Sequence, residues 1–235
     1  MHELITGYGA LLAYFVLCVA GAFVLRRFVA VPREMFRKTL HIIVIGSIFI
    51  LTYVIETWWV SVIASIVFVA MVFPILMFAE RMPGYSELLI ERKKGEIKKS
   101  LVVVFTMFSV LIFVLWGLLG EKYLVIASVF AWGFGDAAAA LVGKRFGRHH
   151  IEGRLVEGRK SLEGTLAMAV VSFVSVLIVF YINGSLEWQI YIPISAVTAV
   201  VCAVVELYTK NGMDTLTCPL SAALTMILLL HLWGV

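Results

Sequence analysis

The sequence is short of charge and of cysteine. Asp, Glu, Lys and Arg make up only 14% of its 235 residues, whereas ordinary soluble domains carry about 25%. So few charged side chains cannot coat a water-soluble domain, which excludes a cytosolic enzyme and a disordered protein. The three cysteines, Cys18, Cys202 and Cys218, form no C-x-x-C pair and no zinc-spaced cluster. They exclude a secreted disulfide scaffold and give no sign of redox chemistry.

Long apolar runs dominate the chain instead. Hydrophobic residues make up 62% of it, against roughly 45–50% in soluble domains. About 20 apolar residues at roughly 1.5 Å each cross about 30 Å of hydrocarbon, and eight runs reach or approach that length. They predict an all-α fold, a polytopic membrane helix bundle of about eight transmembrane helices in a single domain over residues 1–235. The predicted spans are Tyr8–Leu25, Leu40–Ile55, Trp58–Ala79, Leu101–Leu119, Tyr123–Val142, Leu162–Ile182, Trp188–Tyr208 and Pro219–Val235.

The lysines and arginines alternate between the loops that join these spans. All of them except Lys122 fall in the loops after the first, third, fifth and seventh spans. By the positive-inside rule these loops face the cytoplasm, and both termini are predicted to lie outside. In the last span, Pro219 suits the first helical position.

One long polar stretch, 80–100, separates the third and fourth spans. Its Glu87, Glu91, Lys94 and Lys98 have a spacing that suits an amphipathic helix lying along the cytoplasmic surface. A solvated loop that contacts anionic lipid fits the composition equally well.

Several ionisable residues lie within or beside the predicted spans, where a charge costs roughly 2.5–3.5 kcal/mol. Asp136 is in the fifth span, about 10 Å below its cytoplasmic end. Others share that side of the membrane: His41, Glu163, Glu206 and Asp214. Because a bundle can bring different span ends together, these residues predict a polar pocket that opens to the cytoplasm and is partly sunk into the bilayer. The alternative is that Asp136 neutralises Lys144 or Lys160, and that the small residues around it serve close helix packing.

The segment 144–160 between the fifth and sixth spans is rich in basic residues and glycine, and it leads into Ser161, a suitable helix N-cap. Glycines let backbone N–H groups approach an anion, and a helix N-terminus adds favourable partial charge. The segment therefore predicts a polyphosphate cradle, with binding of anionic lipid heads as the alternative. It is not a P-loop, because one residue too many precedes Lys160 and no buried strand comes before it. His149 and His150 are interpreted as surface residues.

These motifs together resemble the signature of the polyprenol kinase family, which includes dolichol kinases, phytol kinases and CTP-dependent diacylglycerol kinases. The family pattern GD-x-x-A-x-x-x-G followed by K-[ST]-x-E-G is matched from Gly135-Asp136 to Gly143, at Gly147, and from Lys160 to Thr165. Its early R-K-x-x-H resembles Arg37-Lys38-Thr-Leu-His41, and its late E … D-N-x-x-x-P resembles Glu206 with the run from Asp214 to Pro219. Thr215 stands where the family pattern has Asn. The matches cover most of the chain in the right order.

The resemblance implies a single integral membrane kinase domain with its active site facing the cytoplasm. Its reaction is transfer of the γ-phosphoryl group of CTP, with Mg²⁺, to the hydroxyl of a membrane isoprenoid alcohol of the dolichol, polyprenol, phytol or geranylgeraniol type. The products are the lipid monophosphate and CDP. The expected partners are the lipid alcohol, CTP and the bilayer, with no nucleic acid.

The same resemblance implies roles for particular residues. Asp136 is expected to bind the metal, with Asp214 or Glu206 as a second metal ligand or as the base that takes the alcohol proton. Glu163 is expected to orient Lys160 or a metal-bound water. The residues implied for nucleotide binding are Gly135, Gly143, Lys144, Gly147, Lys160, Ser161, Glu163 and Gly164. Arg37, Lys38 and His41 are implied as contacts of the nucleotide or of the product phosphate.

Three other functions fit parts of the pattern. A CTP-dependent diacylglycerol kinase would share the whole signature. A CDP-lipid cytidylyltransferase would share the membrane-sunk G-D sequence, but it usually ends in a longer acidic and histidine-containing signature. A small ion-coupled transporter, with Asp136 and Glu206 as relays, would need polar residues through the outer half of the spans, where the sequence has only scattered hydroxyls.

Overall fold

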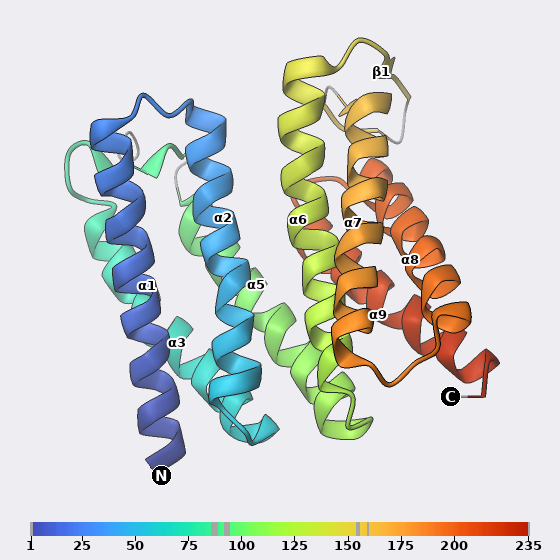
Figure 1. Ribbon diagram of the computed structural model, residues 1–235. Helices are drawn as coiled ribbons and strands as arrows, with labels where there is room; N and C mark the ends of the chain where they lie inside the picture. The colour runs from blue at the N-terminus through green and yellow to red at the C-terminus, as the bar shows by residue number, and fades with distance from the viewer. Residues whose placement is uncertain (1, 86–88, 92–94, 154–155, 159, 235) are drawn as a thin grey trace. The chain divides into compact units, whose positions relative to one another are not determined.

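The computed structural model describes residues 2–234 apart from 86–88, 92–94, 154–155 and 159, and it is built almost entirely of helices (Figure 1). Within this described part, eight helices are long and apolar enough to cross a membrane. The all-α membrane bundle predicted from the apolar runs is therefore confirmed. The helices are α1 (His2–Phe28), α2 (Arg33–Phe49), α3 (Trp58–Ala79), α5 (Glu96–Leu111), α6 (Lys122–Phe146), α7 (Leu162–Asn183), α8 (Trp188–Tyr208) and α9 (Asp214–Leu232). Short π-helical segments extend α2 over Ile50–Val54 and α5 over Ile112–Leu118.

Helix ends match the prediction best where a polar residue directly flanks the apolar run. Helices α3 and α8 have the predicted bounds, and Glu187 and Thr209 flank α8. Helix α9 departs from its predicted bounds, because it begins at Asp214. The prediction that Pro219 occupies the first helical position is therefore wrong, since Pro219 lies inside the helix. The carboxylate of Asp214 in the first turn suits the positive end of the helix, which allows the helix to start before its apolar run.

The long polar stretch between α3 and α5 is described only in part. Glu87 and Lys94, on which the predicted surface helix depends, lie outside the described residues, as do Arg92 and Lys93. Lys98 belongs to α5 itself. The assignment of both termini to the outside stays a prediction.

The chain separates into two compact units, residues 1–118 and 119–235. In the first unit, Phe68 stacks on both Phe15 and Phe105, with ring centroids 4.7 Å apart in each pair, which joins α3 to α1 and α5. The carboxylate of Glu3 accepts hydrogen bonds from the backbone N–H groups of Glu56 and Thr57, each at 2.8 Å. These contacts tie the start of α1 to the connection between α2 and α3. The single domain over 1–235 stays a prediction.

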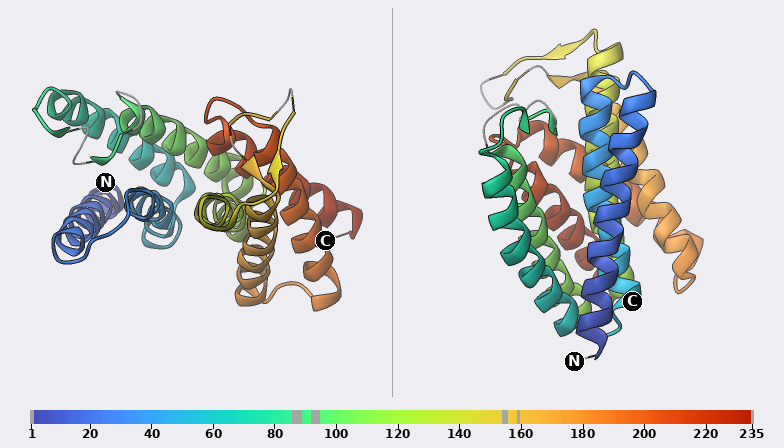
Figure 2. Two further views of the ribbon diagram at one scale, coloured as in Figure 1. Left: turned by 90° about the horizontal axis from the view of Figure 1, so that it is seen from above. Right: turned by 90° about the vertical axis from the view of Figure 1, so that its left-hand side faces the viewer.

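In the second unit, α6 and α7 lie side by side along their length (Figures 1 and 2). The Ser172 hydroxyl donates a hydrogen bond of 2.6 Å to the carbonyl of Ala131 across the two helices. A Cβ on Gly135 would meet that same hydroxyl and would lie 3.1 Å from Met168 Cγ. Trp132 is fully buried beside this contact. The small residues around Asp136 thus serve close helix packing.

Candidate active site

A short hairpin joins α6 to α7 at one end of the second unit. Strands β1 (His150–Ile151) and β2 (Lys160–Ser161) pair antiparallel, with Lys160 opposite Ile151. The backbone N–H of Leu162 donates to the carbonyl of His149 at 2.9 Å. These contacts fix where the chain enters α7. Arg154 and Arg159 of the basic segment lie outside the described residues.

Ser161 caps α7 as its sequence position predicts. Its Oγ accepts a hydrogen bond of 3.2 Å from the backbone N–H of Gly164, and its carbonyl accepts one of 3.2 Å from the Thr165 hydroxyl. Because Lys160 directly precedes the cap, its side chain starts next to the positive end of the helix. This arrangement places a lysine and a helix N-terminus together.

The glycines implied for nucleotide binding also have a packing role here. A Cβ on Gly143 would lie 3.2 Å from Ser161 Oγ, and one on Gly147 would lie 2.8 Å from the same atom. A Cβ on Gly164 would lie 2.9 Å from the carbonyl oxygen of Ala139 and 3.3 Å from the Cα of Gly143. The backbones of α6 and α7 therefore approach closely only because these side chains are absent.

A test follows from the contact at Gly164. Gly164→Ala is expected to lower the free energy of unfolding by about 1–3 kcal/mol, because a methyl group there meets backbone atoms that cannot turn aside. Thermal unfolding of the purified protein in detergent measures the effect. Gly9→Ala is the matched control, since it lies in helix α1 with no atom within 4 Å of its added Cβ. A melting temperature for Gly164→Ala equal to that of the parent would contradict the packing role.

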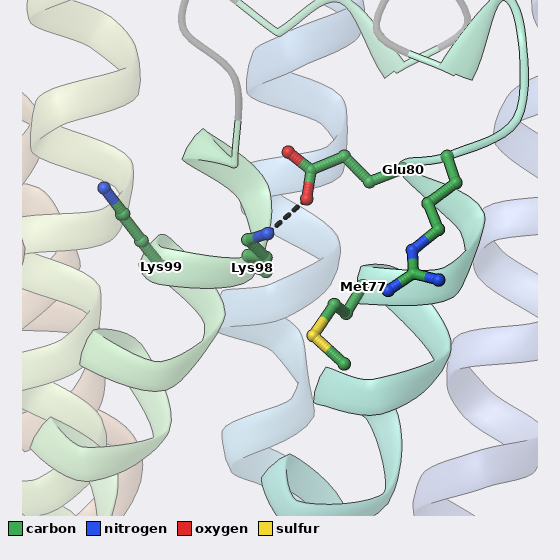
Figure 3. Close-up of a pocket in the computed structure, with 5 residues that line it drawn as sticks. Met77, Glu80, Lys98 and Lys99 are labelled. Atoms are coloured by element: carbon green, nitrogen blue, oxygen red, sulfur yellow. Dashed lines mark hydrogen bonds and ion pairs between the residues drawn. The ribbon is translucent and has the colours of Figure 1, made fainter.

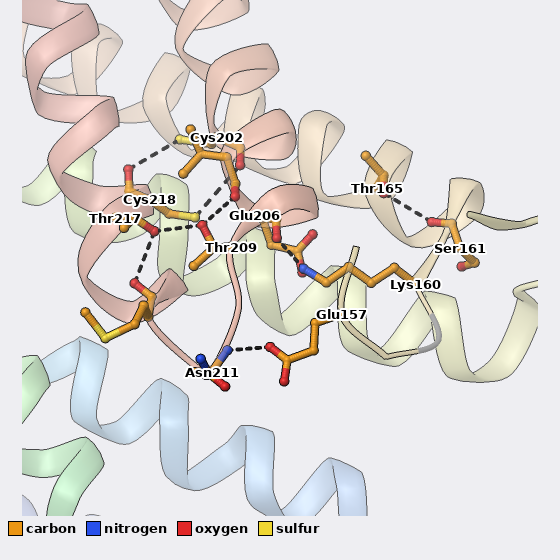
Figure 4. Close-up of polar contacts among 12 residues, drawn as sticks. Glu157, Lys160, Ser161, Thr165, Cys202, Glu206, Thr209, Asn211, Thr217 and Cys218 are labelled. Carbon is orange, nitrogen blue, oxygen red and sulfur yellow. Dashed lines mark hydrogen bonds and ion pairs between the residues drawn. The ribbon is translucent and has the colours of Figure 1, made fainter. Parts of the chain in front are cut away.

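Lys160 forms an ion pair with Glu206. Its Nζ lies 3.0 Å from Oε1 of Glu206, and it also donates to the backbone carbonyl of Glu206 (Figure 4). The side chains of Lys160 and Glu206 are only 19% and 14% exposed, respectively. The contact joins the start of β2 to the last turn of α8, where the negative end of the helix favours a cation. The structure thus brings together two of the predicted residues that are 46 positions apart.

Helix α9 packs against the end of α8 through two cysteines. Cys218 of α9 is fully buried, and its Sγ lies 3.9 Å from the carbonyl of Cys202 on α8. The roles implied for Asp136, Glu206 and Asp214 stay predictions.

Glu163 contacts His149, and its implied role of orienting Lys160 or a metal-bound water stays a prediction. Its Oε1 lies 2.7 Å from Nδ1 of His149, and it also accepts a hydrogen bond of 3.2 Å from the backbone N–H of that residue. His149 is 77% exposed in its side chain, as a surface residue should be. The contact makes Glu163 a tie between α7 and the residue before β1. Sequence spacing offered no signal for this pair.

The turn between α8 and α9 is linked to the hairpin. The backbone N–H of Asn211 donates to the carboxylate of Glu157, and Asn211 adopts a left-handed conformation with φ 58°. Across the same turn, the hydroxyls of Thr209 and Thr217 lie 3.0 Å apart. Two loops that are distant in sequence are thereby joined beside the Lys160–Glu206 pair (Figure 4). Sequence analysis did not identify Glu157 or Asn211.

The early motif lies on α2, in the first unit. Arg37 forms an ion pair of 3.2 Å with Glu34, and its other nitrogen lies 3.8 Å from Glu96. Lys38 is buried. The implied roles of Arg37, Lys38 and His41 stay predictions.

The predicted metal ligands do not form a ready-made cluster. Among the described residues, no three or more His, Cys, Asp and Glu side chains are grouped so that they could hold a metal ion. Magnesium is commonly bound through one or two carboxylates, several waters and substrate phosphate oxygens. Magnesium binding by Asp136, with Asp214 or Glu206, stays a prediction.

One curated relative extends over nearly the whole chain. The chain is 31% identical over 220 residues to a phytol kinase of Synechocystis sp., and the match covers 92% of this chain and 88% of the relative. No family model matches the chain. No solved structure matches it either.

Proposed function

Because the chain belongs to the polyprenol and phytol kinase family, we propose that it is an integral membrane kinase that phosphorylates the hydroxyl group of a prenyl alcohol of the phytol type. The observation that carries the proposal is the similarity to a phytol kinase over 92% of the chain. The ion pair of Lys160 with Glu206 in the second unit supports it, since phosphoryl transfer needs positioned charges of this kind.

We propose CTP as the phosphoryl donor, which rests on the family motifs. In the reaction, the alcohol oxygen forms a bond to the γ-phosphorus as the bond from that phosphorus to the bridging β,γ-oxygen breaks. CDP leaves, and the alcohol proton passes to a carboxylate. The basic loops on the side of Lys160 are expected to face the cytoplasm, so the nucleotide enters from there while the alcohol tail remains in hydrocarbon.

The contacts suggest a separate role in phosphoryl transfer for each charged residue. Glu206 forms an ion pair with Lys160, so we assign to Glu206 the positioning of that lysine and to Lys160 the binding of the transferred phosphate. Asp214 is then the residue that accepts the alcohol proton. Asp136 would hold Mg²⁺, which neutralises charge on the phosphate oxygens when bound.

A direct assay tests the proposed function. The purified full chain is incubated with γ-labelled CTP or ATP and with phytol, geranylgeraniol, dolichol or diacylglycerol. We expect label from CTP in a prenyl monophosphate, with CDP as the second product. Labelling of diacylglycerol alone would contradict the prenyl substrate, and pyrophosphate release would indicate a cytidylyltransferase. Absence of label in every alcohol would overturn the kinase proposal.

A further inference from the structure

The first unit contains a hollow that belongs to none of the motifs used above. It has a volume of about 430 Å³ and lies where α3 ends and α5 begins. Its lining residues are Met77, Glu80, Arg81, Lys98 and Lys99. Three of these five side chains are cationic, which points to an anionic ligand.

A buried ion pair builds one wall of the hollow. The carboxylate of Glu80, only 7% exposed, pairs with the ammonium group of Lys98 (Figure 3). Gly95, with φ 77°, makes the turn into α5, and a Cβ there would lie 2.9 Å from Lys98 Cε. The absence of a side chain at Gly95 therefore leaves room for Lys98. The ion pair holds Lys98 in place, and the charge of Glu80 neutralises the charge of Lys98.

The remaining charge of the hollow is positive. Arg81 and Lys99 are exposed, and no ion pair of either with another described residue occurs. The first turn of α5 contributes favourable partial charge for an anion.

The lining of the hollow also includes one apolar side chain. Met77, in the last turn of α3, is 43% exposed. An exposed apolar side chain in a transmembrane helix faces the acyl chains of the lipids. Arg81 follows Met77 by about one helical turn, so it lies at the level of the lipid head groups. The hollow therefore matches a ligand with an anionic phosphate joined to an acyl chain.

We propose that this hollow binds the head group of an anionic phospholipid, with Arg81 and Lys99 contacting the phosphate and Met77 contacting the acyl chain. The predicted cytoplasmic position of the hollow supports this ligand, because anionic lipids are concentrated in the cytoplasmic leaflet. The proposal does not depend on the kinase reaction.

Binding of short-chain lipids to the purified full chain in neutral detergent tests the proposal. The probes are dioctanoyl phosphatidylglycerol, dioctanoylglycerol and inorganic phosphate, with affinity measured by thermophoresis. We expect Arg81→Gln/Lys99→Gln to weaken phosphatidylglycerol binding about 30-fold, the effect of removing two cations at a lipid surface. The control Arg27→Gln/Arg33→Gln removes two exposed cations from the same predicted side, and it should leave the affinity unchanged.

Each probe and each variant tests one alternative explanation of the binding. Equal weakening in both double variants would overturn the site, since it would show only general attraction to positive charge. Binding of dioctanoylglycerol as tight as that of phosphatidylglycerol would exclude a role for the phosphate, and equally tight inorganic phosphate would exclude the lipid. If the double variant does not fold, Lys99→Gln alone should weaken binding about fivefold. If the parent protein has no kinase activity but its phosphatidylglycerol binding is still weakened by Arg81→Gln/Lys99→Gln, the site is supported while the proposed function is overturned.

Discussion

Asp136→Asn is expected to lower phosphorylation of the prenyl alcohol by roughly 10³-fold, the scale seen when a group that stabilises transition-state charge is removed. The amide keeps the size of the side chain but removes the negative charge that would hold Mg²⁺. Initial rates at saturating CTP and Mg²⁺ measure the effect. Because the change is nearly isosteric, the tight contact of α6 with α7 should remain, and the melting temperature should stay close to that of the parent.

The control for this experiment is Glu187→Gln. Glu187 is an exposed carboxylate at the N-terminal end of α8, while Glu206 lies in the last turn of that helix. The control should retain full activity. Turnover near the parent rate in Asp136→Asn would remove Asp136 from the mechanism and would leave helix packing as the role of this segment of α6.

Lys160→Gln is expected to raise the KM for CTP about 100-fold and also to destabilise the protein. The KM should rise because a phosphate contact is lost, and removal of a charge-assisted hydrogen bond of about 1.5–3 kcal/mol corresponds to that range. Stability should fall because Glu206, only 14% exposed, keeps a charge with its partner gone. Steady-state kinetics and thermal unfolding measure the two effects separately.

The double variant Lys160→Gln/Glu206→Gln separates positioning from catalysis. Replacing both charges removes the uncompensated carboxylate, so the double variant should regain most of the lost stability. Its KM should remain high, since the lysine is still absent. Recovery of the KM together with the stability would show that Lys160 acts only through the fold, and would contradict its assignment to phosphate binding.

The candidate site was predictable as a set of residues but not as a set of contacts. The motif that begins at Lys160 and the distant Glu206 were both identified from sequence, yet their ion pair depends on how the start of β2 meets the last turn of α8. Glu163 illustrates the same limit, because its contact with His149 has no signal in the sequence. Side-chain partners across elements depend on helix rotation and loop path, which local spacing does not encode.

The sequence by itself determined the membrane fold, the bounds of α3 and α8, and the N-cap at Ser161, because apolar length and capping chemistry are properties of a continuous stretch of chain. Only the tertiary structure decided that α9 starts at Asp214, that Gly143 and Gly164 let α6 and α7 approach, and that the lining of the hollow beside Glu80 carries excess positive charge. These features depend on contacts between segments that are distant along the chain, and such contacts arise when the helices pack.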